Sequence, residues 1–279
     1  MPISYLKSRR FKRLVRRVSY LVPRMRVLYR LCKLYVDNYD GENNADMEIN
    51  GEVNALRKLL ECGNESPEVY DVGANRGQWC EAVLRIRPKA RVHCFEPSRR
   101  AFEQLIGRGF PPNVVYNAIG MGERDGTLEL HVDPNCLELS SVYRAGAAND
   151  GLDTEQVRIG TVSSYSKEHA VAFIDFLKID VEGHEFAVLR GAAEMLAEKR
   201  IRFVQFEYGS RYINARVFLK DVIAFVRKFD YSLYKITPCE CRPILDYTPR
   251  LERFENANYL LAARGTSRGD PRSRSFPAA

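Results

Sequence analysis

The sequence has few of the features that mark membrane-spanning, metal-binding or disulfide-rich proteins. No stretch approaches the ~18 uninterrupted apolar residues of a spanning helix, and the basic N-terminus lacks the apolar core and cleavage site of a signal peptide. The 279 residues include only four histidines, and the seven cysteines show no paired metal spacing. These absences argue against a spanning protein or a zinc site, and they predict reduced thiols in a cytoplasmic protein.

The net charge of +7 is concentrated at one end of the chain. Residues 1–36 hold 11 Lys or Arg and no acid, so the remainder carries 32 basic and 36 acidic groups, a balance of −4. A mildly acidic body argues against a groove that follows the phosphates of a nucleic acid. We therefore expect no nucleic-acid partner.

The basic N-terminal segment, residues 1–36, also has a helical period. Its apolar residues recur at steps of three and four from Phe11 to Leu34, which predicts an amphipathic helix bent near Pro23. The opposite face carries Arg and Lys and suits anionic lipid headgroups. Two interpretations stay open. Residues 5–35 contact an anionic membrane peripherally, at the inner face of the plasma membrane, or the helix packs on the domain with its arginines solvated.

The rest of the chain alternates strand and helix patterns. Residues 37–67 are expected to form a polar linker and a leading helix, residues 68–263 one domain, and residues 264–279 a disordered tail. Alternation of strands and helices predicts a parallel sheet. The last two strands have no helical pattern between them, which favours an antiparallel return. The expected strands are 68–72, 91–95, 113–118, 173–179, 201–206, 231–236 and 257–262.

Two further strands are expected outside this alternation, at 127–132 and 157–162. The Ser/Ala/Gly/Asn-rich stretch 140–151 between them is interpreted as a mobile loop and a candidate lid.

A glycine turn directly follows the first strand of the domain. Gly73 and Gly77 would let the backbone approach a ligand closely, because side chains there would block it. Glu96 lies 23 residues after Gly73, at the end of the next strand. A carboxylate there can accept hydrogen bonds from both ribose hydroxyls, so the pair predicts a nucleoside site. The glycines are spaced G-x-x-x-G rather than G-x-G-x-x-G, which argues against a nicotinamide cofactor.

Several motifs occur in the order seen in a known family: residues 69–77, 95–97, 117–120, 177–185, 188–192 and 206–207. With them, residues 68–263 resemble class I S-adenosylmethionine-dependent methyltransferases of the FkbM group. The resemblance implies a Rossmann-like α/β fold, with helices on both faces of a seven-stranded, mostly parallel sheet and a reversed last strand. It also implies S-adenosylmethionine as cofactor and methylation of a hydroxyl on a glycan, glycolipid or secondary metabolite.

The resemblance assigns cofactor roles to particular residues. The glycine turn would hold the methionine end of the cofactor, Glu96 the ribose, and the segment after the third strand the adenine side. Asp180 would face the transferring methyl group or the acceptor. The implied cofactor-binding residues are Asp71, Gly73, Ala74, Asn75, Gly77, Glu96, Asn117 and Ala118.

A hydroxyl acceptor must lose a proton, which requires a base or a metal near the methyl group. The candidate catalytic residues are Asp180, Glu182 and His184 in one strand-to-helix turn, and Glu207 at the end of the next strand. Each has an ordinary structural role as an alternative, since Asp180 can cap the following helix and Glu207 can pair with Arg211. Three acids without known geometry are weak support for Mg²⁺, so no metal is predicted.

Three other functions stay open from the sequence. The basic N-terminus suggests a nucleic-acid methyltransferase, although no Asn-Pro-Pro-Tyr-like motif for base amino groups is present. A nicotinamide-dependent oxidoreductase is disfavoured by the glycine spacing. A non-catalytic protein that lends its basic helix to a membrane assembly is disfavoured because the glycine turn, Glu96 and Asp180 are all intact.

Overall fold

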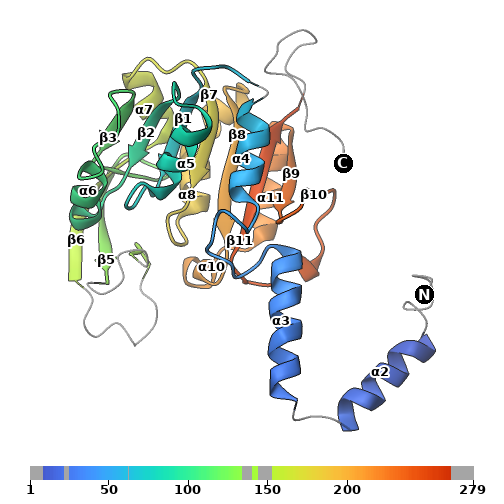
Figure 1. Cartoon of the computed structure of the whole chain (residues 1–279). Helices are drawn as coiled ribbons and strands as arrows, with labels where there is room; N and C mark the ends of the chain where they lie inside the picture. The colour runs from blue at the N-terminus through green and yellow to red at the C-terminus, as the bar shows by residue number, and fades with distance from the viewer. Residues whose placement is uncertain (1–8, 22–24, 62, 134–139, 144–152, 265–279) are drawn as a thin grey trace.

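The computed structural model describes residues 9–21, 25–61, 63–133, 140–143 and 153–264. An eight-stranded sheet with the order β10-β9-β11-β8-β7-β1-β2-β3 forms the centre of the domain (Figure 1). Strands β3, β2, β1, β7 and β8 are parallel to one another, whereas β11 is antiparallel to both β8 and β9. The strands are β1 (Glu68–Val72), β2 (Arg91–Phe95), β3 (Val114–Asn117), β7 (Ile174–Ile179), β8 (Ile201–Tyr208), β9 (Tyr231–Ile236), β10 (Cys241–Ile244) and β11 (Ala257–Ala263).

The expected α/β sheet with a reversed final strand is confirmed, with one strand more than the seven expected. The additional strand, β10, pairs antiparallel with β9 at the edge of the sheet. It is only four residues long and contains Pro243, a residue that the edge of a sheet tolerates because no neighbour needs its missing N–H. A short strand interrupted by proline gives little periodic signal, so the sequence pattern did not reveal it.

Helices cover both faces of the sheet because successive strand residues face opposite ways. Val69 belongs to a buried cluster with Leu56 of α4 and Val83 of α5, and the next residue, Tyr70, belongs to a second cluster that includes Val188 of α8. The helices of the domain are α4 (Glu52–Glu61), α5 (Gln78–Ile86), α6 (Arg99–Ile106), α7 (Val162–Glu168), α8 (Glu185–Gly191), α9 (Ala193–Ala197), α10 (Arg211–Ala215) and α11 (Leu219–Val226), with 3-10 turns η3 (Arg227–Phe229) and η4 (Pro249–Leu251).

A smaller three-stranded sheet contains the two additional strands expected between β3 and β7. It has the order β4-β6-β5, with β5 (Gly126–Val132) antiparallel to β6 (Asp153–Gly160), and β4 (Gly120–Met121) parallel to β6. The second strand was expected to reach Val162, but it stops at Gly160 because Thr161 is the N-cap of α7, which begins at Val162. The Thr161 hydroxyl accepts a hydrogen bond from the backbone N–H of Ser164 at 2.9 Å and so caps the helix.

The N-terminal segment forms two helices, α2 (Arg9–Leu21) and α3 (Arg26–Asp40), which project from the domain (Figure 1). Their apolar side chains are exposed rather than packed on the domain, for example Leu28 at 48% and Leu34 at 66%. The end of α3 is tied to the domain by ion pairs of Lys33 with Glu255 and of Arg253 with Asp40. No described helix is both long and apolar enough to cross a membrane. The expected tail beyond Arg264 and most of the candidate lid, from residue 144, lie outside the described residues.

Candidate functional site

The candidate site lies where the strand order of the sheet reverses direction. Strand β1 has β2 on one side and β7 on the other, so the chain leaves β1 and β7 toward opposite edges. Ligands of open α/β sheets bind in the crevice at the carboxyl ends of the strands at such a point. A pocket lies there, which we call the switch-point pocket. The predicted site residues that line it are Gly73, Asn75, Glu96, Asp180, Glu182 and His184.

The glycine turn fits tightly against the turn that follows β7. Gly73 has a φ of 81°, and a Cβ atom on it would lie 1.8 Å from the carbonyl oxygen of Asp180. Its N–H donates to the carbonyl of Phe95 at 3.0 Å, so the turn is also fixed to the end of β2. Only glycine permits this approach, and the pocket floor is therefore formed by backbone.

Glu96 is held at the end of β2 by two backbone donors. The N–H groups of Asn75 and Ser98 donate to its two carboxylate oxygens, each at 2.9 Å. The side chain is 7% exposed, and burial raises its pKa to about 7. Each carboxylate oxygen has a second lone pair, which can accept a hydrogen bond from a ligand hydroxyl in the pocket.

Asn75 offers an acceptor without a partner. It has a φ of 46°, a conformation that asparagine adopts more readily than most residues. Its Oδ1 is buried and has no hydrogen-bond partner among the described residues. Buried polar atoms are normally satisfied, so this atom points to a ligand donor.

Lys178 joins two of the predicted site residues and was not singled out from the sequence. Its Nζ lies 3.1 Å from a carboxylate oxygen of Asp180 and 3.7 Å from one of Asp71. Burial disfavours its charge, but the carboxylates of Asp180, Asp71 and Glu52 outweigh burial and raise its pKa. Burial raises the pKa of the fully buried Asp71 to about 6, against the opposing effect of Lys178. The sequence did contain a sign of its role, because a lysine inside the apolar run of β7 must be buried and therefore needs an acidic partner.

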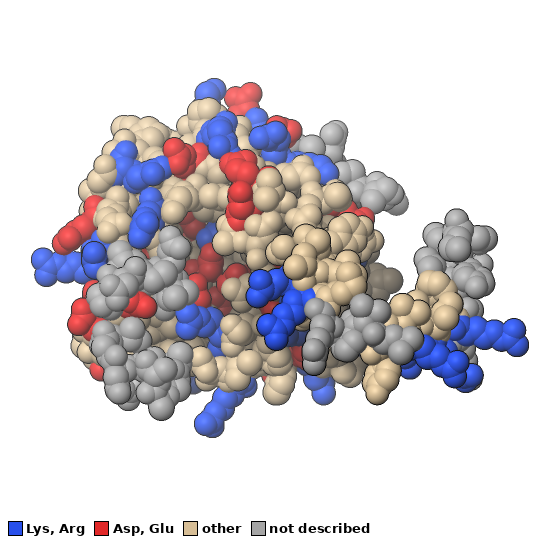
Figure 2. Space-filling model, turned by 60° about the horizontal axis from the view of Figure 1, so that its bottom comes forward, with Lys and Arg blue, Asp and Glu red and all other residues tan. Residues whose placement is uncertain are grey.

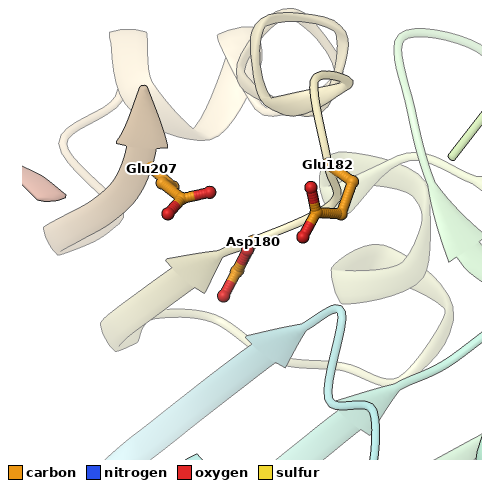
Figure 3. Close-up of side chains that lie close together, drawn as sticks. All are labelled: Asp180, Glu182 and Glu207. Carbon is orange, nitrogen blue, oxygen red and sulfur yellow. The ribbon is translucent and has the colours of Figure 1, made fainter. Parts of the chain in front are cut away.

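Three of the predicted catalytic residues converge from two elements. Asp180 directly follows β7, Glu182 lies in the same turn, and Glu207 lies near the end of β8 (Figure 3). One carboxylate oxygen from each lies within 4.8 Å of the others. We call these three residues the acidic cluster. Figure 2 shows acidic side chains gathered in a hollow on the face that carries the strand ends.

The members of the acidic cluster differ in their partners. Asp180 pairs with Lys178, and Glu182 pairs with Arg211 at 3.2 Å. Burial and then Asp180 raise the pKa of Glu182 to about 7. Burial, followed by the charges of Asp180 and Glu182, raises the pKa of Glu207 well above its ordinary value. Three carboxylates at this spacing can hold a hard cation, or one of them can take up a proton near neutral pH.

A buried carboxyl group holds the turn that carries Glu182. Glu182 has a φ of 53° and Gly183 a φ of 102°, so both residues are in the left-handed region. Glu185 fixes this backbone by accepting from the N–H groups of Val181 and Gly183 at 3.0 and 3.1 Å. Burial raises the pKa of Glu185 to about 8. Strained backbone of this kind persists where surrounding contacts determine it, commonly at functional sites.

His184 lies on the pocket wall as a neutral imidazole. Burial, with the charge of Arg190, lowers its pKa to about 4. Its Nδ1 is 3.1 Å from the hydroxyl of Tyr143, which fixes the ring. A nitrogen whose conjugate acid has this pKa is a weaker base than the carboxylates of Glu182 and Glu207, whose pKa values are raised.

The remaining predicted cofactor residues do not line the switch-point pocket. Ala74 and Asp71 are buried behind it, and the Cβ of a residue at Gly77 would meet Leu105 and Phe110.

On the adenine side, the amide of Asn117 donates to the Cys94 carbonyl and accepts from Tyr165, and Ala118 is exposed. The wall there is formed instead by Pro97, Gly120, Met121 and β6 residues Val157 and Ile159. The roles predicted for Asn117 and Ala118 therefore stay predictions.

The chain matches one protein family over most of the domain. The profile of the family described as Methyltransferase FkbM domain covers residues 71–233, more than half of the 279 residues. The 2-O-methyltransferase NoeI of Sinorhizobium fredii is 28% identical over 179 residues, which are 59% of this chain and 72% of that protein. The hexuronic acid methyltransferase AglP of Haloferax volcanii is 29% identical over 177 residues, 63% of this chain and 67% of that protein.

A solved structure is also similar. The methyltransferase FkbM from Methylobacillus flagellatus is 16% identical with a TM-score of 0.45, and the match covers 70% of this chain and 44% of that chain. The family profile and the curated relatives decide the assignment. The chain belongs to the FkbM methyltransferase domain family, and it is an enzyme that transfers methyl groups.

Proposed function

We propose that this enzyme transfers a methyl group from S-adenosylmethionine to a hydroxyl of a glycan, glycolipid or secondary metabolite. The observation that carries the proposal is the position of the acidic cluster beside the switch-point pocket, because Asp180 and Glu182 belong to both. One similar protein is named a 2-O-methyltransferase and another a hexuronic acid methyltransferase, which favours a sugar hydroxyl.

The switch-point pocket has the groups that the cofactor requires. S-adenosylmethionine, when bound, supplies an electrophilic methyl group on a sulfonium sulfur. Glu96 would accept the ribose hydroxyls, and the unpartnered Oδ1 of Asn75 would accept from the ammonium of the methionine end. The backbone at Gly73 would pass under the cofactor without a side chain. The residues present therefore fit the group.

Within the acidic cluster, Glu207 is the best placed base. Asp180 and Glu182 already pair with Lys178 and Arg211, whereas Glu207 has no ion pair among the described residues. Burial and the neighbouring carboxylates raise its pKa, which makes it a stronger base than an ordinary carboxylate. Asp180 and Glu182 would orient the hydroxyl, and His184 would form part of the wall.

Calorimetry with S-adenosylmethionine and mass spectrometry of candidate glycans test this proposal. We expect saturable binding that Glu96→Ala weakens, and a mass gain of one methyl-for-hydrogen exchange on an accepted glycan. Glu103→Ala, on an exposed residue of α6, is the matched control. An absence of saturable binding in the wild type would refute the proposal.

The N-terminal helices support a second part of the proposal, peripheral contact with an anionic membrane. Helix α2 carries Arg10, Lys12, Arg13, Arg16 and Arg17 beside exposed apolar side chains, and it stands away from the body in Figure 2. Such a helix binds anionic lipid surfaces through both kinds of side chain. A lipid-linked acceptor would then lie near the enzyme.

Co-sedimentation with vesicles of phosphatidylglycerol and phosphatidylcholine tests the membrane contact. Arg13→Glu, Arg16→Glu and Arg17→Glu together should release the protein from the vesicles. The control reverses three exposed basic residues of the domain, Arg57, Lys58 and Lys220. Equal sedimentation of the two triple variants would remove this part of the proposal and leave the methyl transfer intact.

A further inference from the structure

A second cavity lies on the opposite side of Glu207 from the switch-point pocket. Its volume is about 250 Å³. Five asparagines from two distant parts of the sequence line it together with Glu207, namely Asn43, Asn44, Asn50, Asn256 and Asn258. We call it the asparagine cavity. Neither the sequence motifs nor the family roles assign it a function.

One wall of the asparagine cavity is a loop, residues 41–51, that is fixed against the sheet. Gly41 and Gly51 both have positive φ, and a Cβ on either would lie 2.5 Å or less from the carbonyl oxygen of Ile236 or Thr237. The N–H of Asn43 donates to the Asn256 carbonyl at 2.8 Å, which joins the loop to the residue before β11. Residues 37–51 are a linker or loop by their polar, Asn- and Gly-rich composition, and in the structure their second part is a loop fixed against the sheet. The cavity is therefore preformed, which lowers the entropic cost of binding.

The other wall places amide groups beside the carboxylate. Asn258 lies directly opposite Glu207 in the antiparallel pair of β11 and β8, so their side chains point to the same face of the sheet. The Oδ1 of Asn258 accepts from Gln205 at 3.1 Å. This bond orients the amide so that its N–H groups are the part left for a ligand.

The lining has a distinctive chemistry. It combines amide donors and acceptors with one carboxylate, and it includes no Lys, Arg or His among the described residues. The amides of Asn43 and Asn50 already donate within the protein, to Glu255 and Glu52. The amide and carboxylate groups of the other lining residues can form hydrogen bonds with hydroxyls, which are donors and acceptors at once. A carboxylated ligand would meet Glu207 with no cation in the lining to balance the two charges, and like charges in contact repel each other.

The cavity is joined to the methyl-transfer site through Glu207. Glu207 lines the asparagine cavity, and one of its carboxylate oxygens lies within 4.8 Å of an oxygen of Asp180 and of Glu182, which line the switch-point pocket. The volume is also sufficient, because a cavity of about 150 Å³ already holds a six-membered carbon ring. A sugar ring in the asparagine cavity would thus direct one hydroxyl at Glu207.

From this arrangement we infer that the asparagine cavity is the acceptor subsite and that it selects an uncharged sugar over a sugar acid. The inference rests on the proposed methyl transfer and adds the acceptor class to it. The hydroxyl oxygen forms the new bond to the methyl carbon, and the electron pair of the broken carbon–sulfur bond stays on sulfur. The hydroxyl proton goes to a carboxylate oxygen of Glu207.

Saturation-transfer NMR on the full chain with S-adenosylhomocysteine tests the inference. The probes are the methyl glycosides of glucose, galactose and mannose, with methyl glucuronoside as the charged counterpart. We expect transfer to at least one neutral glycoside and a weaker signal for the glucuronoside. In Ala45→Phe, which fills the cavity from an exposed lining position, the neutral glycoside should bind at least about tenfold more weakly.

Two further variants make the test decisive. Ile49→Phe adds an aromatic ring to the same loop at a position 60% exposed and outside the lining, so its binding should equal that of the wild type. Asn256→Ala removes one amide without filling the cavity and should weaken binding as well. Calorimetry of S-adenosylhomocysteine confirms that each variant is folded.

The outcomes separate the two proposals. If S-adenosylhomocysteine does not bind the wild type, the proposed function is wrong. If it binds and no neutral glycoside gives a signal, the acceptor inference alone is overturned. Unchanged glycoside binding in Ala45→Phe, or a stronger signal for the glucuronoside, overturns it too.

Discussion

The switch-point pocket and the asparagine cavity flank the acidic cluster and are built by opposite means. The pocket is formed by backbone in the left-handed region and by buried carboxylates that backbone N–H groups hold, as at Gly73 and Glu96. The cavity is formed by amide side chains carried on a docked loop and on β11. A backbone pocket admits one shape of ligand, whereas a wall of amides can be altered residue by residue.

The largest effect is expected from adding a side chain to the glycine turn of the switch-point pocket. Gly73→Ala should weaken binding of S-adenosylmethionine by at least about 100-fold, because its Cβ would lie 1.8 Å from the Asp180 carbonyl oxygen and the two turns would have to separate. Isothermal titration calorimetry measures this loss. Acceptor glycosides should still bind the asparagine cavity if the two sides are independent.

A matched control separates the steric contact from the cost of the backbone conformation. Gly109 also has a positive φ, 63°, but a Cβ there would meet nothing within 4 Å. Gly109→Ala therefore incurs the same left-handed penalty of about 1–2 kcal/mol without the clash. Equal cofactor affinity in the two variants would show that the turn is not fitted as the structure indicates.

The next largest effect is expected at Glu207, which lies between the switch-point pocket and the asparagine cavity. Glu207→Gln should lower kcat by about 10²–10⁴-fold, the usual contribution of a general base, while cofactor affinity stays near that of the wild type. Glu168→Gln, on an exposed residue of α7, should leave both unchanged. Steady-state rates with an accepted glycan measure kcat for both variants. A full rate in Glu207→Gln would transfer the role of base to Glu182 or Asp180.

The two sides also differ in how far the sequence could predict them. Gly73, Asn75 and Glu96 were expected to lie together because they occupy turns after adjacent parallel strands, whose carboxyl ends must meet. Asn43 and Asn258 are more than 200 residues apart, and only the insertion of β11 between β8 and β9 brings them together. No local period encodes that insertion, and the reversed strand was predictable only from the missing helix before it.

The turn that follows β7, which Glu185 holds in place, should make the stability of the protein depend on pH. The pKa of Glu185 is raised from 4.5 to about 8, so the folded state keeps a proton that the unfolded state loses. The free energy of unfolding should therefore fall as pH rises from 4.5 to 8, by up to about 1.4 kcal/mol per pH unit for this group. Burial also raises the pKa of Asp71 and Glu96, which adds to the slope.

Urea unfolding at several pH values measures this slope. Glu185→Gln keeps an acceptor for the N–H groups of Val181 and Gly183 and cannot ionise, so its curve should be flatter by about one proton. The exposed Glu194→Gln on α9 should retain the wild-type slope. Parallel curves for wild type and Glu185→Gln would contradict the prediction.

The smallest effect is expected from removing divalent cations. Two of the three carboxylates in the acidic cluster already face a protein cation, since Lys178 lies 3.1 Å from Asp180 and Arg211 lies 3.2 Å from Glu182. A bound metal would have to compete with both, whereas a proton on Glu207 requires neither to move. Dialysis against EDTA should therefore leave kcat within about twofold of its starting value, a difference of roughly 0.4 kcal/mol in the barrier. Loss of activity that Mg²⁺ restores would make the acidic cluster a metal site and the hydroxyl a metal-bound acceptor.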